Sequence, residues 1–427
     1  MFSNCHLGKE QKRIIRLASV GGMLEFYDFT IYGLFAVYFA GQFFPSNNNF
    51  ITIVSSYAVF LIGYIARPLG GIIFSHIGDE IGRKTVMIVT MVLMGVASLG
   101  LGLLPTYDSI GLWAPVCMLL LRLLQGLAIG GELPSMIVYV AESIPEQRGI
   151  AMGGVFAGTV GGLIPGMLIN LLITHYLTFQ QIHDFGWRIP FLLGSLLCII
   201  GYQVRSRLHE TAAFIGLKER TKFPLGVLIT HHFPKILIGT GLISAVATPI
   251  LLAIIFMPTY LTKILKFNPD VVSSNILIAT ILSILSTYIM GLLTQRCSPY
   301  TLMKTGLLML IVAAAICYSM LALQWNLLIA LSLFAIFQGA LVSLPPTLLS
   351  YLFPVEIRLS GVALSYNIAF VIFGGLTPIV VTTIIGCTKL LYFAPFVGLF
   401  VVALVALLSL YCYRRFIPDT PLTVLAK

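Results

Sequence analysis

Long runs of apolar residues, each about the length of a membrane-crossing helix, follow one another along the whole chain. A helix needs about 20 residues of this kind to cross the hydrocarbon core of a bilayer. Twelve such stretches lie at 15–42, 50–74, 85–104, 112–141, 149–174, 187–207, 234–262, 271–294, 301–321, 325–350, 359–386 and 389–413. The sequence therefore predicts an all-α membrane protein with 12 transmembrane helices.

The composition excludes a soluble fold. Charged residues make up 9% of the 427 residues and apolar residues 58%, whereas a soluble domain carries about 25% charged residues. So few charges cannot cover a folded chain with a hydrated surface, and so many apolar residues do not stay disordered. The seven cysteines are scattered without a CxxC pair, so neither a disulfide framework nor a metal site is expected.

Basic residues are unevenly shared between the loops on the two sides of the predicted helices. Cytoplasmic loops carry an excess of Lys and Arg. One set of loops, with the two chain ends, holds Lys9, Lys12, Arg13, Arg16, Arg83, Lys84, Arg148, Arg205, Arg207, Lys218, Arg220, Lys222, Lys235, Arg296, Lys304, Arg358, Arg414, Arg415 and Lys427. The opposite loops hold only Arg188, Lys263, Lys266 and Lys389. We therefore expect a multi-pass protein of the inner (cytoplasmic) membrane of a bacterial cell, with both termini cytoplasmic.

The longest hydrophilic stretch, residues 208–233, divides the predicted helices into two sets of six. We expect an N-terminal six-helix bundle over 1–207, a cytoplasmic central loop over 208–233 and a C-terminal six-helix bundle over 234–427. Arg148 after the fourth helix recurs as Arg358 after the tenth, 358 − 148 = 210 positions later, which indicates two pseudo-symmetric halves. Such halves are typical of transporters, whose substrate site lies between them near the bilayer midplane.

Two carboxylates lie well inside the first predicted helix, in the segment GGMLEFYDFTIYGLF. Glu25 and Asp28 are three residues apart, which places them about one turn apart on the same helix face. Ionised carboxylates at this depth are costly and usually face a cavity or a partner. We expect at least one of the two to exchange a proton near neutral pH. The alternative is a pair of purely structural charges.

The fourth predicted helix carries polar residues along one side, in the segment RLLQGLAIGGELPS. Arg122 and Gln125 are three residues apart, and Gln125 and Glu132 are seven apart, so the three share a face. Arg122 is interpreted as the only basic residue deep in a predicted helix. It is expected to pair with Glu25, Asp28 or an anionic substrate group, and a static salt bridge between the two helices is the alternative.

The second half offers neutral polar groups in place of charges. Its predicted helices contain no Asp or Glu inside an apolar span, which favours coupled transport over a symmetric pore. The candidate substrate contacts of the two halves are Tyr27, Tyr32, Gln125, Gln338, Ser365, Tyr366 and Asn367. Polar aromatic residues on membrane helices more often serve packing or the membrane interface, which is the alternative for the tyrosines.

Four glycines recur at a spacing of four residues in the fifth predicted helix, namely Gly154, Gly158, Gly162 and Gly166. A small residue at every fourth position leaves a smooth stripe on one helix face, along which another helix approaches closely. The spacing therefore predicts a tight helix contact, which is either static or a sliding surface.

Several separated segments resemble a known family of membrane carriers. RPLGGIIFSHIGDEIGRK after the second helix resembles the loop signature of the major facilitator superfamily. More narrowly, five further segments resemble the metabolite:proton symporter family, namely LEFYDFTIYG, RLLQGLAIGGE, GWRIPF, RSRLHETAAF and FPVEIRLSGVALSYNIAFVIFGGLTP. That family includes proline/betaine, α-ketoglutarate, citrate and shikimate carriers. The resemblance implies the major facilitator fold and proton-coupled symport of a small anionic or zwitterionic metabolite by alternating access.

By matching positions, the resemblance also implies roles for two sets of residues. The residues implied in coupling proton transport to substrate transport are Glu25, Asp28, Arg122 and Glu132. A cytoplasmic gate motif is expected from Asp79, Gly82, Arg83, Lys84, Glu142 and Arg148. The second copy of the loop signature, between the eighth and ninth helices, is eroded, because Gln295 stands where an acid is expected.

The expected partners are a small-molecule substrate, protons and the lipid bilayer, and the energy source is the proton gradient. No cofactor, metal ion, ATP or nucleic acid is expected, and the protein is expected to be a monomer. An enzyme is not expected, because the histidines lie in loops or near helix ends without an acidic partner. The alternatives are an exporter of a small metabolite or siderophore on the same fold, and a non-transporting membrane sensor.

Overall fold

The computed structural model describes residues 7–45, 49–217, 224–388 and 391–416, and the regular elements in these ranges are helices. In chain order they are α1 (Lys9–Phe43), α2 (Asn49–Glu80), α3 (Arg83–Leu103), α4 (Tyr107–Ile110), α5 (Trp113–Ser143), η1 (Pro145–Gln147), α6 (Arg148–Gly161), α7 (Leu163–Tyr176), α8 (Phe179–Gln181), η2 (Ile182–Gly186), α9 (Arg188–Ser206), α10 (Ala212–Ile215), α11 (Pro224–His231), α12 (Phe233–Leu251), η3 (Leu252–Phe256), α13 (Met257–Thr259), η4 (Tyr260–Ile264), α14 (Pro269–Leu293), α15 (Pro299–Ala322), α16 (Leu327–Leu341), α17 (Leu344–Leu352), η5 (Val355–Ile357), α18 (Arg358–Ala369), η6 (Phe370–Gly375), α19 (Leu376–Thr388) and α20 (Ala394–Phe416). Of these, η1 and η5 are 3-10 helices, and η2, η3, η4 and η6 are π-helices.

Ten helical stretches of the described chain are long and apolar enough to cross a membrane. The helices α1 and α2, with 35 and 32 residues, are long enough as well. Some crossings are assembled from shorter pieces, because α6 continues into α7, and α12 continues into η3 and α13. The twelve predicted crossings are therefore all found as helices.

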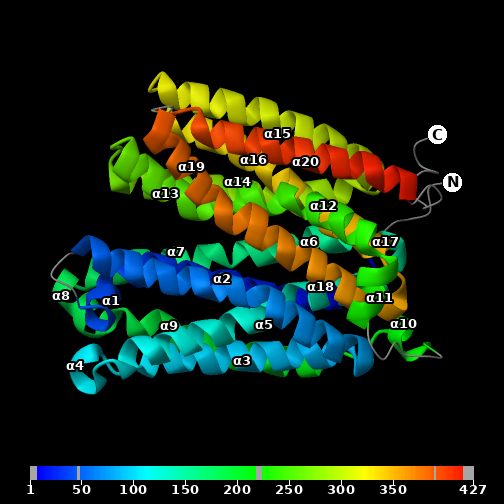
Figure 1. Cartoon of the computed structure of the whole chain (residues 1–427), viewed down its shortest axis with the longest axis horizontal. Helices are drawn as coiled ribbons and strands as arrows, with labels where there is room; N and C mark the ends of the chain where they lie inside the picture. Colours follow the sequence, from blue (N-terminus) through cyan, green and yellow to red (C-terminus); the bar gives the residue numbers. More distant parts are fainter. Residues whose placement is uncertain (1–6, 46–48, 218–223, 389–390, 417–427) are drawn as a thin grey trace.

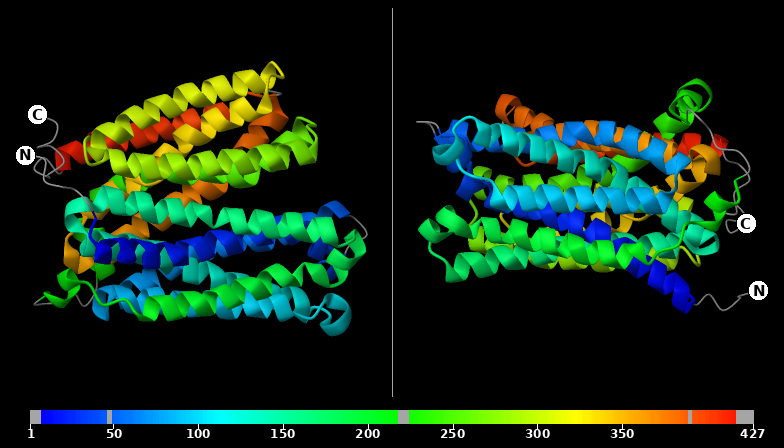
Figure 2. Two further views of the ribbon diagram at one scale, coloured as in Figure 1. Left: turned by 180° about the vertical axis from the view of Figure 1, so that it is seen from behind. Right: turned by 90° about the horizontal axis from the view of Figure 1, so that it is seen from below.

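The long helices run side by side and fall into two groups (Figure 1, Figure 2). In the first group α2 packs against α5 and α3 against α9, and in the second α14 packs against α16 and α12 against α20. The groups meet where α2 contacts α18 and where α6 contacts α14. The domain boundary at residues 208–233 stays a prediction. Five of the predicted orientation markers lie outside the described residues, namely Lys218, Arg220, Lys222, Lys389 and Lys427.

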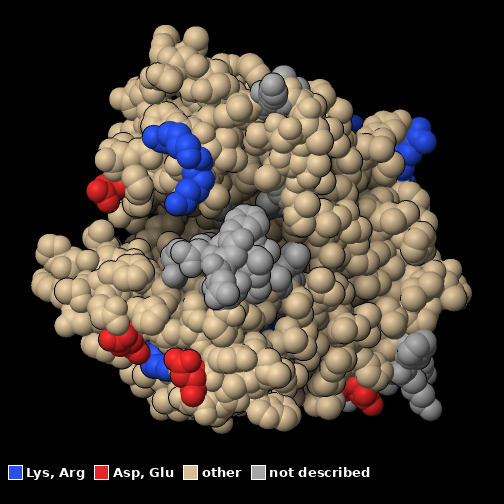
Figure 3. All heavy atoms as spheres, turned by 60° about the vertical axis from the view of Figure 1, so that its left-hand side comes forward, with Lys and Arg blue, Asp and Glu red and all other residues tan. Residues whose placement is uncertain are grey.

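Large apolar side chains cover the outside of both groups. Leu103, Leu171, Ile329 and Leu408 are each more than half exposed. Most of the face seen in Figure 3 carries neither basic nor acidic side chains. A soluble monomer does not expose apolar area on this scale, so the outer surface is suited to contact with lipid tails.

The described chain ends lie on the same side of the molecule. The start of α1 and the end of α20 are found there (Figure 2). We name it the basic side, because Lys9, Lys84, Lys304 and Arg414 belong to helix ends on this side. It is the side that the sequence predicts to be cytoplasmic.

The glycine stripe of the fifth predicted crossing packs against α1. A Cβ atom on Gly158 would lie 2.7 Å from the Cβ of Ser19, and one on Gly162 would overlap the carbonyl oxygen of Met23. The stripe therefore brings the two helices into backbone contact, as predicted. Its partner, which the sequence did not indicate, is the helix of the two buried carboxylates.

Candidate functional site

Glu25 of α1 faces Arg67 of α2 in the interior of the protein. The two residues are 4% and 3% exposed, and Glu25 Oε1 lies 3.7 Å from a terminal guanidinium nitrogen of Arg67. A direct hydrogen bond between charged groups is about 2.7–2.9 Å long, so this pair is loosely held. Within the described chain, Glu25 Oε2 and Arg67 Nε have no hydrogen-bond partner. Both charges are therefore available to a third group.

The burial of Arg67 shows that one prediction is wrong. Arg122 is not the only basic residue deep in a helix, because Arg67 lies inside the crossing predicted at 50–74. Pro68 follows it and removes one hydrogen bond from the ladder of α2, since proline has no N–H. The sequence did contain the signal, which is a basic residue beside a proline within an apolar stretch.

Aromatic rings from both groups of helices enclose the guanidinium of Arg67. Its central carbon lies 5.2 Å from the ring centre of Tyr64 and 4.8 Å from that of Phe370. Phe370 in turn stacks on Tyr366, a predicted substrate contact, with 4.7 Å between ring centres. A cation is attracted to the face of an aromatic ring. Arg67 of α2 thus contacts η6 in the second group of helices and, through Phe370, is linked to α18.

A cavity lies beside the Glu25–Arg67 pair. The first group of helices contributes Glu25, Tyr64 and Arg67 to its lining, and the second contributes Ile250, Ile254 and Phe370. The pair therefore lies at a cavity between the two groups. Ionisable residues inside a membrane protein usually face such a cavity and mark a pathway for ions or substrate.

Two π-helical stretches form part of the wall of this cavity. Ile254 belongs to η3, which continues α12, and Phe370 belongs to η6, which packs against α12. π-helical turns are rare and frequently occur at functional sites. The apolar patterns at 234–262 and 359–386 predicted continuous helices, so these turns were not foreseen.

Asp28 contacts different neighbours from Glu25. It accepts a hydrogen bond of 2.6 Å from Ser98 of α3 and another from Gln125 of α5. Both partners belong to the first group of helices, and Asp28 is 4% exposed. Three residues along a helix turn a side chain by about 60°, which is enough to direct the two carboxylates to different helices. They do not form one site in this structure.

Arg122 lies inside the first group, close to Asp28. Its guanidinium carbon is 3.4 Å from the ring centre of Tyr32, and its charge attracts that of Asp28. Tyr27, another predicted substrate contact, donates a hydrogen bond of 2.8 Å to the carbonyl oxygen of Pro190. These residues form an internal cluster, apart from the Glu25–Arg67 pair.

The structure pairs Glu132 with Arg205 of α9. Glu132 also accepts a hydrogen bond of 2.6 Å from Thr90, and Arg205 donates to the carbonyl oxygens of Ala18 and Met87 at 3.2 and 3.0 Å. Arg205, predicted as an orientation marker in or beside the central loop, lies in the last turn of α9 and is fully buried. The pair braces α1, α3, α5 and α9.

The neutral candidates of the second group do not gather at one place. Asn367 reaches the first group, where it donates a hydrogen bond of 2.8 Å to a carbonyl oxygen of α5. Gln338 accepts one of 3.0 Å from Ser283 and lines a second cavity. Ser365 donates one of 3.4 Å to a carbonyl oxygen of α12, inside the second group. Of these, Asn367 joins the two groups directly.

At the basic side, Asp79 caps the start of α18 across the two groups. It accepts hydrogen bonds from the backbone N–H groups of Leu359 and Ser360 at 3.3 and 2.9 Å, and from the Ser360 hydroxyl at 2.6 Å. A carboxylate here satisfies free N–H groups and is attracted by the helix dipole. Arg83 lies 3.3 Å from the same carboxylate and donates to the carbonyl oxygen of Val355 at 2.8 Å.

Glu142, near the end of α5, interacts with several of the polar side chains at the basic side. Its carboxylate lies 3.3 Å from Arg83 and 3.1 Å from Arg358, and it accepts a hydrogen bond of 2.7 Å from Thr211. Arg358 and Thr211 were not among the predicted gate residues. The signal for them was their place in the segments FPVEIRLSG and RSRLHETAAF, which carry the family resemblance.

The remaining predicted gate residues lie on the same side. Lys84 takes part through its backbone N–H, which is 3.0 Å from the carboxylate of Glu210. Gly82 has a φ of 132°, a backbone conformation that favours glycine. Arg148 donates a hydrogen bond of 3.3 Å to the carbonyl oxygen of Ser350 in α17. The predicted gate residues thus gather at the basic side.

The sequence model of the Major Facilitator Superfamily matches residues 18–250, which is more than half of the chain. The chain belongs to the major facilitator superfamily. This facilitator is 31% identical over 415 residues to the glycine betaine/proline/ectoine/pipecolic acid transporter OusA of Dickeya dadantii (strain 3937), covering 93% of this chain and 82% of that protein. It is 30% identical over 414 residues to the proline/betaine transporter of Escherichia coli (strain K12), with 93% and 82% covered.

A solved structure supports the fold of this facilitator. The proton:xylose symporter XylE bound to 6-bromo-6-deoxy-D-glucose matches it with a TM-score of 0.79 at 16% identity, covering 98% of this chain and 99% of that one. At this identity the likeness bears on the fold alone. The predicted all-α, twelve-helix major facilitator fold is confirmed, and the protein is a multi-pass membrane transporter of small molecules, not an enzyme.

Proposed function

We propose that this facilitator is a symporter that moves a small zwitterionic or anionic metabolite together with a proton by alternating access. The Glu25–Arg67 pair at the cavity between the halves carries the proposal. It places a proton-accepting group beside a carboxylate-binding group. The proton gradient is the proposed energy source, without a cofactor. The protein acts as a monomer in the inner membrane of a bacterial cell, with the basic side toward the cytoplasm.

Proton uptake and substrate binding are coupled through Arg67 in this mechanism. While Glu25 is ionised, it neutralises Arg67. A proton on Glu25 removes that counter-charge and leaves a buried cation unpaired, which is costly in the membrane interior. A substrate carboxylate restores the balance by accepting two parallel hydrogen bonds from the guanidinium. Proton and substrate are therefore taken up together.

A zwitterionic substrate fits the surroundings of Arg67 best. Its cationic group has aromatic side chains nearby, because Tyr64 and Phe370 line the cavity of the pair, and aromatic rings attract ammonium groups. Proline and betaine, which appear in the names of the similar transporters, are zwitterions. These names support a charged head group over a sugar.

Alternating access requires a barrier on one side of the substrate site while the other side admits substrate. On the basic side, Asp79, Arg83 and Glu142 hold the start of α18 against the ends of α2 and α5. These contacts support a cycle in which the basic side is closed in this conformation and opens when the network breaks.

The experiment is uptake into proteoliposomes under an imposed pH gradient, with labelled proline and glycine betaine as probes. Glu25→Gln is expected to abolish gradient-driven accumulation while sparing exchange of labelled for unlabelled substrate, since a neutral side chain mimics the protonated state. Glu10→Gln, on the exposed first turn of the same helix, is the matched control and keeps full uptake. Accumulation that survives collapse of the gradient contradicts proton coupling.

Two further variants separate the charged groups. Arg67→Gln is expected to weaken substrate binding roughly 30-fold or more, because it removes one partner of a buried charge pair. Asp28→Asn is expected to reduce uptake less than Glu25→Gln does, because Asp28 is bonded inside the first half. If Asp28→Asn alone abolishes accumulation, Asp28 carries the proton and the assignment to Glu25 is wrong.

A further inference from the structure

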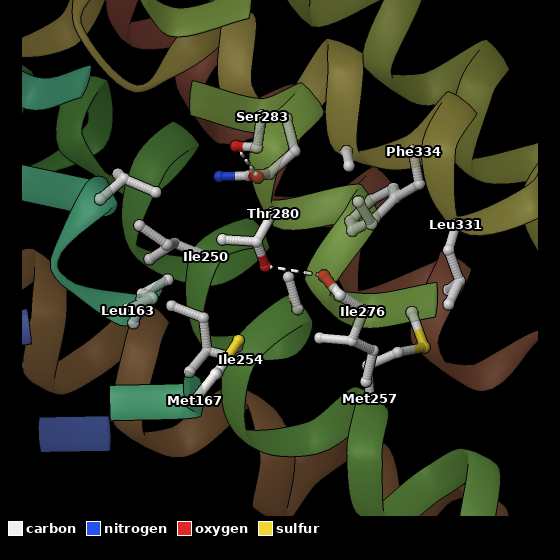
Figure 4. A pocket seen from close by; sticks show the side chains of 15 residues that line it. Leu163, Met167, Ile250, Ile254, Met257, Ile276, Thr280, Ser283, Leu331 and Phe334 are labelled. Atoms are coloured by element: carbon white, nitrogen blue, oxygen red, sulfur yellow. Dashed lines mark hydrogen bonds between the residues drawn. The ribbon is translucent and has the colours of Figure 1, made fainter. Parts of the chain in front are cut away.

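A second cavity lies between the halves of the transporter. Its walls come from α6 and α7 in the first half, and from α12, η3, α13, α14 and α16 in the second. Figure 4 shows Leu163, Met167, Ile254, Met257 and Phe334 around it. The mechanism described above does not use this space.

The two cavities share a wall. Ile250 of α12 and Ile254 of η3 line both the second cavity and the cavity of the Glu25–Arg67 pair. The same two side chains therefore border the charged groups and the apolar space. The two cavities are therefore neighbours, on either side of these two side chains.

The lining of the second cavity is suited to an apolar group. None of the described residues that line it is charged. Its hydroxyl groups already have acceptors, because Thr280 donates to the carbonyl oxygen of Ile276 at 2.8 Å and Ser283 donates to Gln338 Oε1 at 3.0 Å (Figure 4). An ion would lose its hydration here without replacement, whereas an apolar group fits a cavity of this kind.

We propose that the second cavity is an apolar subsite for the same substrate whose head group binds at Glu25 and Arg67. The substrate class is then a zwitterion, such as an amino acid or a betaine-like molecule, that carries an aliphatic chain or a single aromatic ring. This inference rests on the proposed function and narrows it. Charge at the pair selects the head group, and the apolar cavity selects the side group.

The size of the subsite is set by short side chains on two helices of the second half. Ala279 on α14 and Ala335 on α16 both line the cavity and are 8% and 7% exposed. A larger residue at either position occupies the space proposed for the side group. Met167 and Met257, on facing walls from the two halves, are flexible and let the cavity adjust to different shapes.

The test compares two probes with the same head group, L-alanine and L-leucine, for binding to the purified full-length protein. We expect L-leucine to bind roughly tenfold more tightly or better, because added methylene groups in an apolar pocket are worth a factor of this order. Equal affinities for the two probes overturn the subsite. If neither probe binds, the proposal of a site for a zwitterionic head group is wrong, and the proposed subsite is wrong with it.

Variants test whether the preference for L-leucine over L-alanine arises in the second cavity. Ala335→Phe is expected to lower the affinity for L-leucine to that for L-alanine and to leave L-alanine binding unchanged. Ala279→Leu, on α14, repeats the test from a second helix if the first variant does not fold. Ile329→Phe, on the lipid-facing side of the same helix as Ala335, is the matched control and keeps the preference. A preference that survives both cavity-filling changes overturns the subsite.

One more variant distinguishes failure of the subsite from failure of the proposed function. Arg67→Gln is expected to weaken both probes equally, so that the ratio of their affinities is kept. If it weakens neither, the head group binds elsewhere and both proposals are wrong. If it weakens both while L-alanine and L-leucine bind equally to the unaltered protein, the proposed head-group site stands and only the apolar subsite is wrong.

Discussion

Two helix contacts, which we call seams, join the halves of this transporter: α2 with α18, and α6 with α14. They are made by different kinds of interaction. Between α2 and α18 the contact at the basic side is electrostatic, because Asp79 caps the start of α18 beside Arg83. Between α6 and α14 the contact is made by glycines. A Cβ atom on Gly153 would lie 2.5 Å from the Cα atom of Gly291, so the two backbones touch.

The seams occupy corresponding places in the two halves. Gln295 follows α14 where the repeat of the loop signature expects an acid like Asp79, and Thr294 packs against Gly149 at the start of α6. An ionic contact weakens when one of its charges is removed, whereas a backbone contact changes only when whole helices move. We therefore interpret α2–α18 as a latch and α6–α14 as a pivot.

The largest effect is expected at the pivot. Gly153→Ala places a methyl group against the backbone of Gly291, and overpacking of a close contact costs about 1–3 kcal/mol. We expect uptake to fall by roughly tenfold and the unfolding temperature to drop. Gly161→Ala in the same helix is the matched control, because a Cβ atom there meets nothing within 4 Å. Normal uptake and stability of Gly153→Ala would contradict the pivot.

A smaller free-energy cost is expected at the latch, where it is read from a different measurement. Asp79→Asn removes a charge that interacts with the dipole of α18, which is worth about 0.3–2 kcal/mol. Hydrogen exchange of the amide groups of Leu359 and Ser360 is therefore expected to accelerate by up to roughly 30-fold. Glu80→Gln, whose side chain is 63% exposed, serves as control. Equal exchange in the two variants would mean that the cap does not hold the seam closed.

The smallest effects distinguish two arginines at equivalent positions. Arg358 lies 3.1 Å from the carboxylate of Glu142, whereas Arg148 donates to a neutral carbonyl oxygen at 3.3 Å. Both bonds have a charged donor, but only Arg358 also has a charged acceptor, so its Coulomb attraction is stronger. We expect Arg358→Gln to change the uptake rate several-fold and Arg148→Gln to change it by about twofold or less. The reverse order would show that ionic closure is not confined to the α2–α18 seam.

The sequence predicted the features that depend on local pattern. An apolar run of about 20 residues spans a bilayer whatever lies around it, so the crossings were found. Charges are scarce in this chain, which made Glu25 and Asp28 conspicuous. Asp79 and Arg83 lie in one contiguous loop signature, and the structure places both at the contact between the halves.

Contacts between distant segments were not predictable in the same way. A shift of about 60° around α1 decides that Glu25 meets Arg67 while Asp28 meets Ser98. Arg205 lies near the end of the crossing predicted at 187–207, and only its contact with Glu132 of α5 shows that it is buried. The π-helical turns η3 and η6 leave the apolar pattern unchanged, so periodicity gave no sign of them.

The positions of the ion pairs along the chain bear on how the protein is made. A chain is synthesised from its N-terminus, and an unpaired charge in the lipid is costly. The pairs Glu25–Arg67 and Glu132–Arg205 are both complete once α9 has left the ribosome. Asp79, in contrast, meets its partners on α18 only after the second half has been made. Biogenesis therefore allows the first half to settle in the bilayer early, while the contact between Asp79 and α18 forms only later.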